Sequence, residues 1–232
     1  MKKLLIVFGI FLANLSYGQI ANIDLNGVPL RVTAYSGIDG SPYLYDEWSN
    51  ADLTMKGGSM KEKISARLNI HDNELEVINE AGNKILLDKS YLTSFVLERP
   101  AIVLAREEGL LSRLTFKNGF ENIKGLTTKD FVNVLAEGQK YTLVRKFYSD
   151  LVTPPKNSYT PTPGRMFVFE QSFYIIDDSG DVNSVRAKSS SITKGLSPQD
   201  KALAKQIIKE NKYDLSREDH LVSFFMKLNS SK

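Results

Sequence analysis

Residues 63–70 read Lys63-Ile64-Ser65-Ala66-Arg67-Leu68-Asn69-Ile70, a regular alternation of polar and apolar side chains. In a β-strand, successive side chains point to opposite faces, so the four apolar residues of this run share one face. The next residues, His71-Asp72-Asn73, predict a turn, because Asp and Asn side chains readily hydrogen-bond their own backbone. Residues 74–78 then resume an extended pattern. The segment therefore predicts an antiparallel hairpin with one buried face.

Strand-like runs separated by turns fill most of the chain up to residue 187. Beyond the first hairpin they are residues 84–87, 91–97, 102–105, 131–135, 141–148, 166–176 and 182–187. Turns are predicted at residues 80–83 and 177–181, and at Glu137-Gly138-Gln139, where the glycine would supply a left-handed residue. A helical turn over residues 130–135 is the alternative to one of these strands. The runs predict a mostly antiparallel β-sheet, arranged as a meander, a sandwich or a roll.

The last part of the chain changes to a helical pattern. Ser197-Pro198-Gln199-Asp200 combines a capping serine, a proline suited to the first helical position and an acid in the first turn, so we expect a helix over residues 198–210. Residues 216–219 repeat this cap. Apolar residues then recur at helical spacing, at Leu221, Phe224, Phe225 and Leu228. A C-terminal helical hairpin over residues 197–229 is expected to close the sheet, which makes the predicted fold class α+β.

A proline-rich stretch at residues 153–164 interrupts the strand pattern. It holds Pro154, Pro155, Pro161 and Pro163. Proline lacks the backbone N–H that a sheet ladder needs, so the stretch predicts an exposed connection or a loop along one edge. With this loop and the helices, residues 19–232 predict a single β-rich domain.

The first 18 residues predict a cleavable signal peptide. Two lysines precede an apolar run at residues 4–15, and the small residues Ser16 and Gly18 fit a cleavage site before Gln19. The alternative is an N-terminal membrane anchor, but the run is shorter than the roughly 20 residues that span a bilayer. No cysteine is present to carry a lipid. We therefore expect a periplasmic or secreted protein that does not span a membrane once the leader is removed.

Charge and cysteine content narrow the function classes. The chain has 30 Lys and Arg against 27 Asp and Glu, and removal of Lys2 and Lys3 with the leader leaves 28 basic residues. Such near neutrality disfavours a nucleic-acid-binding protein, in which a clustered basic stripe is typical. The absence of cysteine excludes a disulfide framework. A hydrophobic core must stabilise the fold, and about 214 residues after cleavage suffice for one.

Three short motifs are spread along the chain. They are Gly40-Ser41-Pro42-Tyr43-Leu44 with Trp48 shortly after, Arg67-Leu68-Asn69-Ile70-His71-Asp72-Asn73-Glu74-Leu75, and Phe173-Tyr174 shortly before Asp178-Ser179-Gly180. Together with the leader, this series resembles uncharacterised exported proteins of Bacteroidota. The resemblance implies a location in the Gram-negative cell envelope, and it implies no activity.

The sequence offers no recognisable metal or cofactor site. The chain has only two histidines and no cysteine, so a zinc site built from these residues is disfavoured. His71, beside acidic residues, could join a metal site or act as a general base, but we expect an exposed turn residue. His220 is expected at the surface. Residues 177–181 suggest a calcium loop only superficially, because the positions of Gly180 and Lys188 do not match an EF-hand.

Catalytic signatures are equally weak. Gly57-Gly58-Ser59 lacks the second glycine of a hydrolase nucleophile elbow. Neighbouring carboxylates such as Glu107-Glu108 or Asp46-Glu47 would point to opposite faces of a strand. A triad or carboxylate pair assembled from distant residues stays open. The sequence therefore predicts no catalytic residue, no metal and no cofactor.

An aromatic cluster is the candidate site for a ligand or a partner. Its members are Tyr35, Tyr43, Tyr45 and Trp48, in a segment that also contains Gly37, Gly40 and Pro42. Aromatic rings on a turn-rich segment can stack on sugars or anchor a protein interface. The alternative is that these rings cap one end of the β core. Tyr159, in the proline-rich stretch, is a weaker second candidate.

Two hypotheses about function follow. The preferred one is a non-catalytic, exported binding or structural protein of the cell envelope, with an unidentified protein or glycan as its ligand. The alternative is a hydrolase that acts on envelope or extracellular polymers through a catalytic pair assembled across the sheet.

Overall fold

The computed structural model describes residues 25, 27–30, 35–155 and 164–231. The expected signal peptide and Tyr159 lie outside these residues, as does most of the expected proline-rich loop. Within the described residues, the helices are too short or too polar to cross a membrane.

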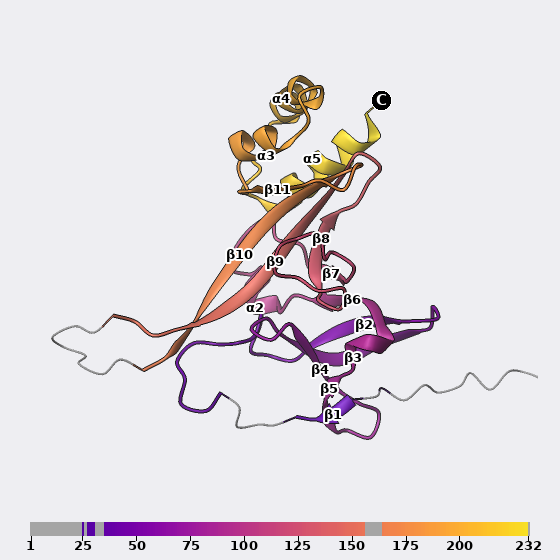
Figure 1. Cartoon of the computed structure of the whole chain (residues 1–232), viewed down its shortest axis with the longest axis vertical. Helices are drawn as coiled ribbons and strands as arrows, with labels where there is room; N and C mark the ends of the chain where they lie inside the picture. Colours follow the sequence, from indigo (N-terminus) through magenta and orange to yellow (C-terminus); the bar gives the residue numbers. More distant parts are fainter. Residues whose placement is uncertain (1–24, 26, 31–34, 156–163, 232) are drawn as a thin grey trace, which may run out of the picture.

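Eleven strands of the described residues form one antiparallel sheet (Figure 1). They are β1 (Gly27–Pro29), β2 (Ser49–Met55), β3 (Met60–Asn69), β4 (Glu74–Ile78), β5 (Lys84–Leu87), β6 (Leu92–Glu98), β7 (Arg113–Lys117), β8 (Val132–Ala136), β9 (Tyr141–Val152), β10 (Met166–Asp177) and β11 (Val182–Val185). Their spatial order is β1-β5-β4-β3-β2-β6-β7-β8-β9-β10-β11. Two meanders, β2–β5 and β6–β11, meet where β2 pairs with β6. The α+β class and the antiparallel sheet are confirmed, in the form of one open sheet.

The hairpin predicted around residues 71–73 is formed by β3 and β4. Leu68 pairs with Leu75 across the two strands, and both side chains are buried. Asn73 closes the turn with a φ of 55°, a left-handed conformation that Asn tolerates better than most residues. The polar and apolar alternation therefore identified both strands and the residues that face the core.

The helical hairpin at the C-terminus is also confirmed. It consists of α4 (Asp200–Asn211) and α5 (Glu218–Ser230). The Ser197 hydroxyl accepts a hydrogen bond from the Asp200 backbone N–H at 3.3 Å, so the serine cap works although regular helix begins two residues later than expected. The four apolar residues of the predicted stripe are at most 1% exposed: Leu221, Phe224, Phe225 and Leu228. Their burial attaches α5 to the sheet.

Some segments differ from the prediction. Residues 102–105, expected to be extended, lie in or next to the short helix α2 (Ala101–Leu104). Pro100 directly precedes this helix, and proline suits a helix start because the first N–H groups there have no partner inside the helix. The strands β1, β2 and β7, the 3-10 turn η1 (Lys89–Tyr91) and the helix α3 (Ser189–Gly195) occur in addition to the predicted elements. The helical alternative at residues 130–135 is wrong, because β8 occupies most of this range.

Gly138 lies in the expected β8–β9 connection, but the reason for a glycine there differs from the prediction. It is absent from the glycines with a positive φ. Instead, Asn229 of α5 packs against it, and a Cβ atom on Gly138 would lie 2.2 Å from Asn229 Cγ. Close approach of the last helix therefore requires glycine at this position, and a left-handed turn does not.

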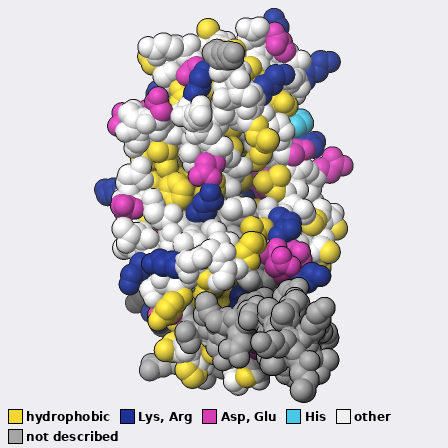
Figure 2. Space-filling model, turned by 90° about the vertical axis from the view of Figure 1, so that its right-hand side faces the viewer, with side chains coloured by type: hydrophobic (Ala, Val, Ile, Leu, Met, Phe, Trp, Pro, Cys, Tyr) yellow, Lys and Arg dark blue, Asp and Glu magenta, His cyan; other side chains and the backbone are white. Residues whose placement is uncertain are grey.

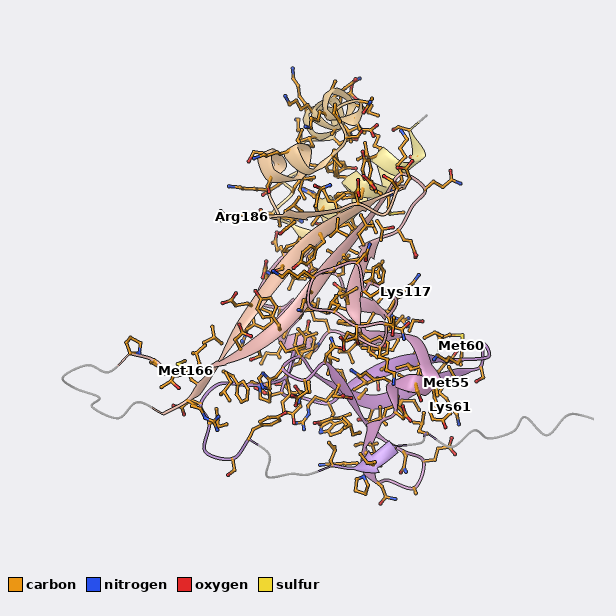
Figure 3. All side chains as sticks on the ribbon, in the orientation of Figure 1. Met55, Met60, Lys61, Lys117, Met166 and Arg186 are labelled. Atoms are coloured by element: carbon orange, nitrogen blue, oxygen red, sulfur yellow. The ribbon has the colours of Figure 1, made fainter. Side chains whose placement is uncertain are left out.

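The long strands β9 and β10 connect the two ends of the molecule. In Figure 1 they rise from the lower half, where β1–β5 lie, to the helices α3–α5 at the top. Met166 begins β10 near the lower end, and Arg186 follows β11 near the helices (Figure 3). One buried cluster comes mainly from β2–β7 and contains Phe95 stacked on Phe116 at 4.7 Å. A second lies between the sheet and the C-terminal helices, and Leu111 packs against both.

Candidate functional site

The four residues of the expected aromatic cluster lie at three places. Tyr35 and Tyr43 border one pocket, Tyr45 borders a second pocket, and Trp48 borders neither of these two. An isolated β-bridge pairs Tyr43 with Asn69 at the end of β3. This pairing fixes the aromatic segment on the sheet, and the side chains along it then reach different surroundings.

The first pocket, here called the carboxylate pocket, has a volume of about 330 Å³. Its polar lining consists of Tyr35, Tyr43, Asn69, Asp72, Glu74 and Glu76, with apolar residues from β1, β5 and the chain after β1 at its edge. Glu74 and Glu76 alternate on β4, so they share one face of the strand, and Leu75 and Val77 point to the other. Asp72 precedes them by the same spacing of two. The spacing of these three acids is visible in the sequence. It is a signal for the acidic residues of the pocket, which the aromatic cluster alone did not reveal.

Each phenol in the carboxylate pocket donates a hydrogen bond to one carboxylate. The Tyr43 hydroxyl donates to Glu76 Oε1 at 3.0 Å, and the Tyr35 hydroxyl donates to Asp72. Asn69 Nδ2 donates to the Tyr35 hydroxyl at 3.0 Å. The pocket therefore combines carboxylates, an amide and phenols, which are the groups that hydrogen-bond hydroxyl-rich ligands.

Burial and the neighbouring acids keep both phenols protonated. Burial, followed by the hydrogen bond to Asp72, raises the pKa of Tyr35 to about 12. Burial, followed by the charge of Glu76, raises the pKa of Tyr43 to about 12. Burial also raises the pKa of Glu74 above its ordinary value, although Lys89 Nζ lies 3.5 Å from this carboxylate and opposes the shift.

A stacked cation lies beside Tyr43. The Arg67 guanidinium lies 3.7 Å from the centroid of the Tyr43 ring and 5.0 Å from that of Trp48. The same guanidinium forms an ion pair with Glu76 at 2.7 Å. Arg67 therefore neutralises the most buried acid of the pocket and orients the Tyr43 ring. The half-buried Trp48 ring extends this aromatic surface outside the pocket.

His71 is exposed in the turn, as predicted, but it also contacts β9 and β10. Its Nδ1 atom lies 2.6 Å from the backbone oxygen of Ser149. Its ring centroid lies 5.1 Å from that of Phe167 and 6.2 Å from that of Tyr35. Among the described residues, no group of three or more His, Asp and Glu side chains could hold a metal. His71 therefore positions the Tyr35 side of the pocket against the long strands.

The other sequence candidates are explained by local structure. His220 Nδ1 accepts a hydrogen bond from the Asp214 backbone N–H at 3.1 Å. The Asp177 carboxylate accepts hydrogen bonds from the backbone N–H groups of Ser179 and Asp181, and Gly180 has a φ of 86°. Residues 177–181 are therefore the tight turn of the β10–β11 hairpin, whose conformation accounts for the acids and the glycine.

The second pocket, here called the arginine pocket, has a volume of about 290 Å³ and contains Tyr45. Arg99 Nε donates to the Tyr45 hydroxyl at 2.9 Å. Arg99 also donates two hydrogen bonds to Glu218 of α5, at 2.9 and 3.0 Å. Arg145 of β9 donates to the same carboxylate and to Asn133 Oδ1. Two buried arginines thus share one buried glutamate.

The charges of this cluster do not balance. Burial pushes the pKa of Glu218 upward, but the hydrogen bond from Arg99 and the charge of Arg145 outweigh burial and hold the pKa below its ordinary value. Burial lowers the pKa of Arg145, and Glu218 opposes that shift. Arginine stays protonated in proteins, so the three side chains carry a net charge of about +1 in the interior.

The sequence analysis found Tyr45 of the arginine pocket but missed its charged residues, although a signal for them was present. Arg145 stands between Leu143 and Phe147 on the buried face of β9. Glu218 precedes Leu221 by three residues and so falls on the apolar stripe of α5. A charged residue at a core-facing position requires a partner, because burial of an unpaired charge is unfavourable. Such positions are candidate site residues even without a motif.

Although the overall charge is nearly neutral, a groove between α3 and α4 is basic. Lys194, Lys201, Lys205 and Lys209 line it. On the face of the molecule shown in Figure 2, basic and acidic side chains are interspersed. Four lysines are fewer than the roughly 6–10 phosphate contacts of a typical DNA-binding protein. The groove is a local cluster that overall near neutrality does not reveal.

Comparisons with known proteins add no assignment: no protein-family model, no curated protein and no solved structure matches the chain. The function must therefore be argued from the two pockets.

Proposed function

We propose that this protein is a non-catalytic, exported binding protein of the cell envelope that takes a hydroxyl-rich ligand, such as a glycan, in the carboxylate pocket. The observation that carries the proposal is the convergence of the Tyr35 and Tyr43 phenols with Asn69, Asp72 and Glu76 on one cavity. The export half of the proposal rests on the leader-like residues 1–18 and places the protein in the periplasm or outside the cell.

The chemistry of the pocket matches that of sugar hydroxyls. The carboxylates of Asp72, Glu74 and Glu76 can accept hydrogen bonds from ligand hydroxyls. The Tyr43 phenol donates its proton to Glu76, so its oxygen can accept a hydrogen bond from a further hydroxyl. Because Arg67 neutralises Glu76, a ligand without charge fits this part of the pocket. The exposed part of the Trp48 ring offers a surface on which a further sugar ring can stack.

Affinity electrophoresis tests this proposal. The protein is run in native gels that contain laminarin, mannan or dextran, and we expect retardation by at least one polysaccharide. Tyr43→Ala should weaken that binding by about tenfold, because it removes a ring and a hydrogen bond from the pocket.

Tyr148→Ala is the matched control. The Tyr148 hydroxyl also donates to a carboxylate, that of Glu170 at 2.9 Å, but outside the pocket. The Tyr148→Ala variant should bind the polysaccharide as strongly as the unmodified protein does. Absence of retardation in every gel, or equal loss in the two variants, contradicts the proposal.

A hydrolase remains the second candidate because of Glu74. Burial raises the pKa of Glu74 in a pocket that also holds Asp72 and Glu76, and glycosidases use a pair of carboxyl groups of which one has a raised pKa. Release of reducing ends from a bound polysaccharide, abolished by Glu74→Gln, would establish this activity. Binding without release would establish the non-catalytic function.

A further inference from the structure

The arginine pocket carries more positive charge than its own acid neutralises. Arg99 and Arg145 are 6% and 3% exposed, and Glu218 is the only described carboxylate that accepts hydrogen bonds from them. Glu107 also borders the cavity, but its side chain is exposed. An excess charge in the interior is unfavourable unless a counter-charge approaches it. One additional negative charge would balance the cluster.

Hydrogen-bond donors also remain available in this pocket. Two guanidinium groups have ten N–H donors, and the hydrogen bonds to Tyr45, Leu111, Glu218 and Asn133 use seven of them. The Tyr45 hydroxyl accepts from Arg99, and no described residue accepts its proton. Burial raises the pKa of Tyr45, so this hydroxyl stays a donor at neutral pH. The pocket can therefore donate to an anionic group.

Apart from Glu107, Gln171 and Ser216, the rest of the pocket is apolar. Phe147, Phe169 and Phe173 line it beside Leu44, Val103 and Leu110. The Phe169 side chain is 52% exposed although it lies on a sheet. The volume of about 290 Å³ lies at the small end of the range for ligand pockets. The space thus fits a small apolar body next to a charged end.

We propose that the arginine pocket binds a small carboxylate with an apolar body, such as a medium-chain alkyl carboxylate, whose single negative charge balances the two arginines against Glu218. The planar carboxylate matches the geometry of guanidinium N–H donors, and the phenylalanine rings cover the apolar part. A doubly charged phosphate would overcompensate the cluster. This site is separate from the carboxylate pocket and does not depend on the proposed glycan binding.

Titration of the purified protein with octanoate tests the proposal. We expect saturable binding of one octanoate per chain, and 1-octanol should bind about tenfold more weakly because it lacks the charge. In labelled protein, the side-chain Nε–H signals of Arg99 and Arg145 should shift on octanoate binding and should shift less with 1-octanol at equal concentration, because 1-octanol occupies less of the protein and has no carboxylate. Equal affinity for the two probes, or binding that shifts neither signal, would overturn the proposal.

A matched pair of variants locates the site without removing a buried arginine. Gln171 is exposed and borders the pocket, so Gln171→Glu places a negative charge at its mouth and should weaken octanoate binding by about fivefold. Gln139→Glu adds the same charge in the exposed β8–β9 connection and should leave the affinity unchanged. Equal effects of the two variants would show that octanoate binds elsewhere and would refute the assignment.

Discussion

Arg99 and Glu218 are 119 residues apart in the sequence and form a two-point ion pair, with Arg99 Nη2 and Nη1 lying 2.9 and 3.0 Å from the two carboxylate oxygens. Arg99 directly follows β6, and Glu218 begins α5. The Glu218 carboxylate also accepts a hydrogen bond from the Leu111 backbone N–H at 2.9 Å. One buried carboxylate therefore joins the last helix to the middle of the sheet.

Removal of this carboxylate should strongly destabilise the fold. Glu218→Ala leaves Arg99 and Arg145 buried without a counter-charge, and loss of one partner from a buried pair typically costs about 3–5 kcal/mol. Urea unfolding at neutral pH measures the change. Glu108→Ala is the control, because the Glu108 side chain is 95% exposed and its removal should leave stability nearly unchanged. Similar unfolding midpoints for the two variants would contradict the structural role of Glu218.

Acid should weaken the same contact. The folded-state pKa of Glu218 lies below its ordinary value, so the ionised carboxylate stabilises the fold above a pH of about 4.3. That contribution is lost as the pH falls through the folded-state pKa. Melting temperatures measured from neutral pH downward should therefore fall more steeply for the unmodified protein than for Glu218→Gln, which has no carboxylate to protonate. Parallel curves would show that Glu218 contributes nothing to acid sensitivity.

The carboxylate pocket makes a separate prediction at high pH. Tyr35 and Tyr43 have a pKa of about 12 in the folded protein, so both should ionise after the exposed tyrosines. Ultraviolet difference titration of phenolate absorption measures this order. Tyr43→Phe should remove one late-ionising group and leave the early part of the titration curve unchanged.

Because the pKa values of Tyr35 and Tyr43 are raised on folding, the contribution of the two phenols to the free energy of unfolding is present below about pH 10 and declines as the pH rises toward 12. A curve in which Tyr43→Phe removes an early-ionising group would be incompatible with the pocket.

The sheet can be predicted from the sequence because its pattern is local. Alternation in residues 63–70 and 74–78 identifies two strands, their buried faces and the turn between them. The β7 strand has the same pattern, with Leu114 and Phe116 buried between polar neighbours, and could have been found in the same way. The helix α2 could not, because four residues are too few to show helical periodicity.

The candidate sites are harder to predict because they are assembled from distant residues. Sequence proximity placed all four aromatic residues in one cluster. In the structure, Tyr45 lies beside Arg99, and Trp48 lies beside the Arg67 guanidinium, outside both pockets. The polar and apolar pattern of a strand or helix shows which of its faces a residue occupies. It does not show which residue of another element lies opposite that face. Acids or arginines at unusual positions in that pattern would have been the better guide.

Gly138 and Asn229 provide a last test of how the final helix docks. A Cβ atom at residue 138 would lie 2.2 Å from Asn229 Cγ and 2.7 Å from its Cβ, so the asparagine must move to make room. Asn229 cannot move freely, because its side chain accepts from the Tyr141 backbone N–H and donates to the Tyr141 backbone oxygen, both at 2.8 Å. Gly138→Ala should therefore destabilise the fold by about 1–3 kcal/mol, as overpacking commonly does.

Gly164→Ala is the control for this substitution. Among the described residues, no atom beyond Gly164 and its chain neighbours lies within 4 Å of the Cβ position at Gly164, so urea unfolding should show little change for that variant. Asn229→Ala should be destabilising alone, because it removes both hydrogen bonds to Tyr141. In the double variant, Gly138→Ala should cost less than it does alone, since the contact with Asn229 Cγ is gone and only the contact with the Cβ atom of residue 229 remains. Additive losses in the double variant would mean that Gly138 is required for a reason other than its contact with α5.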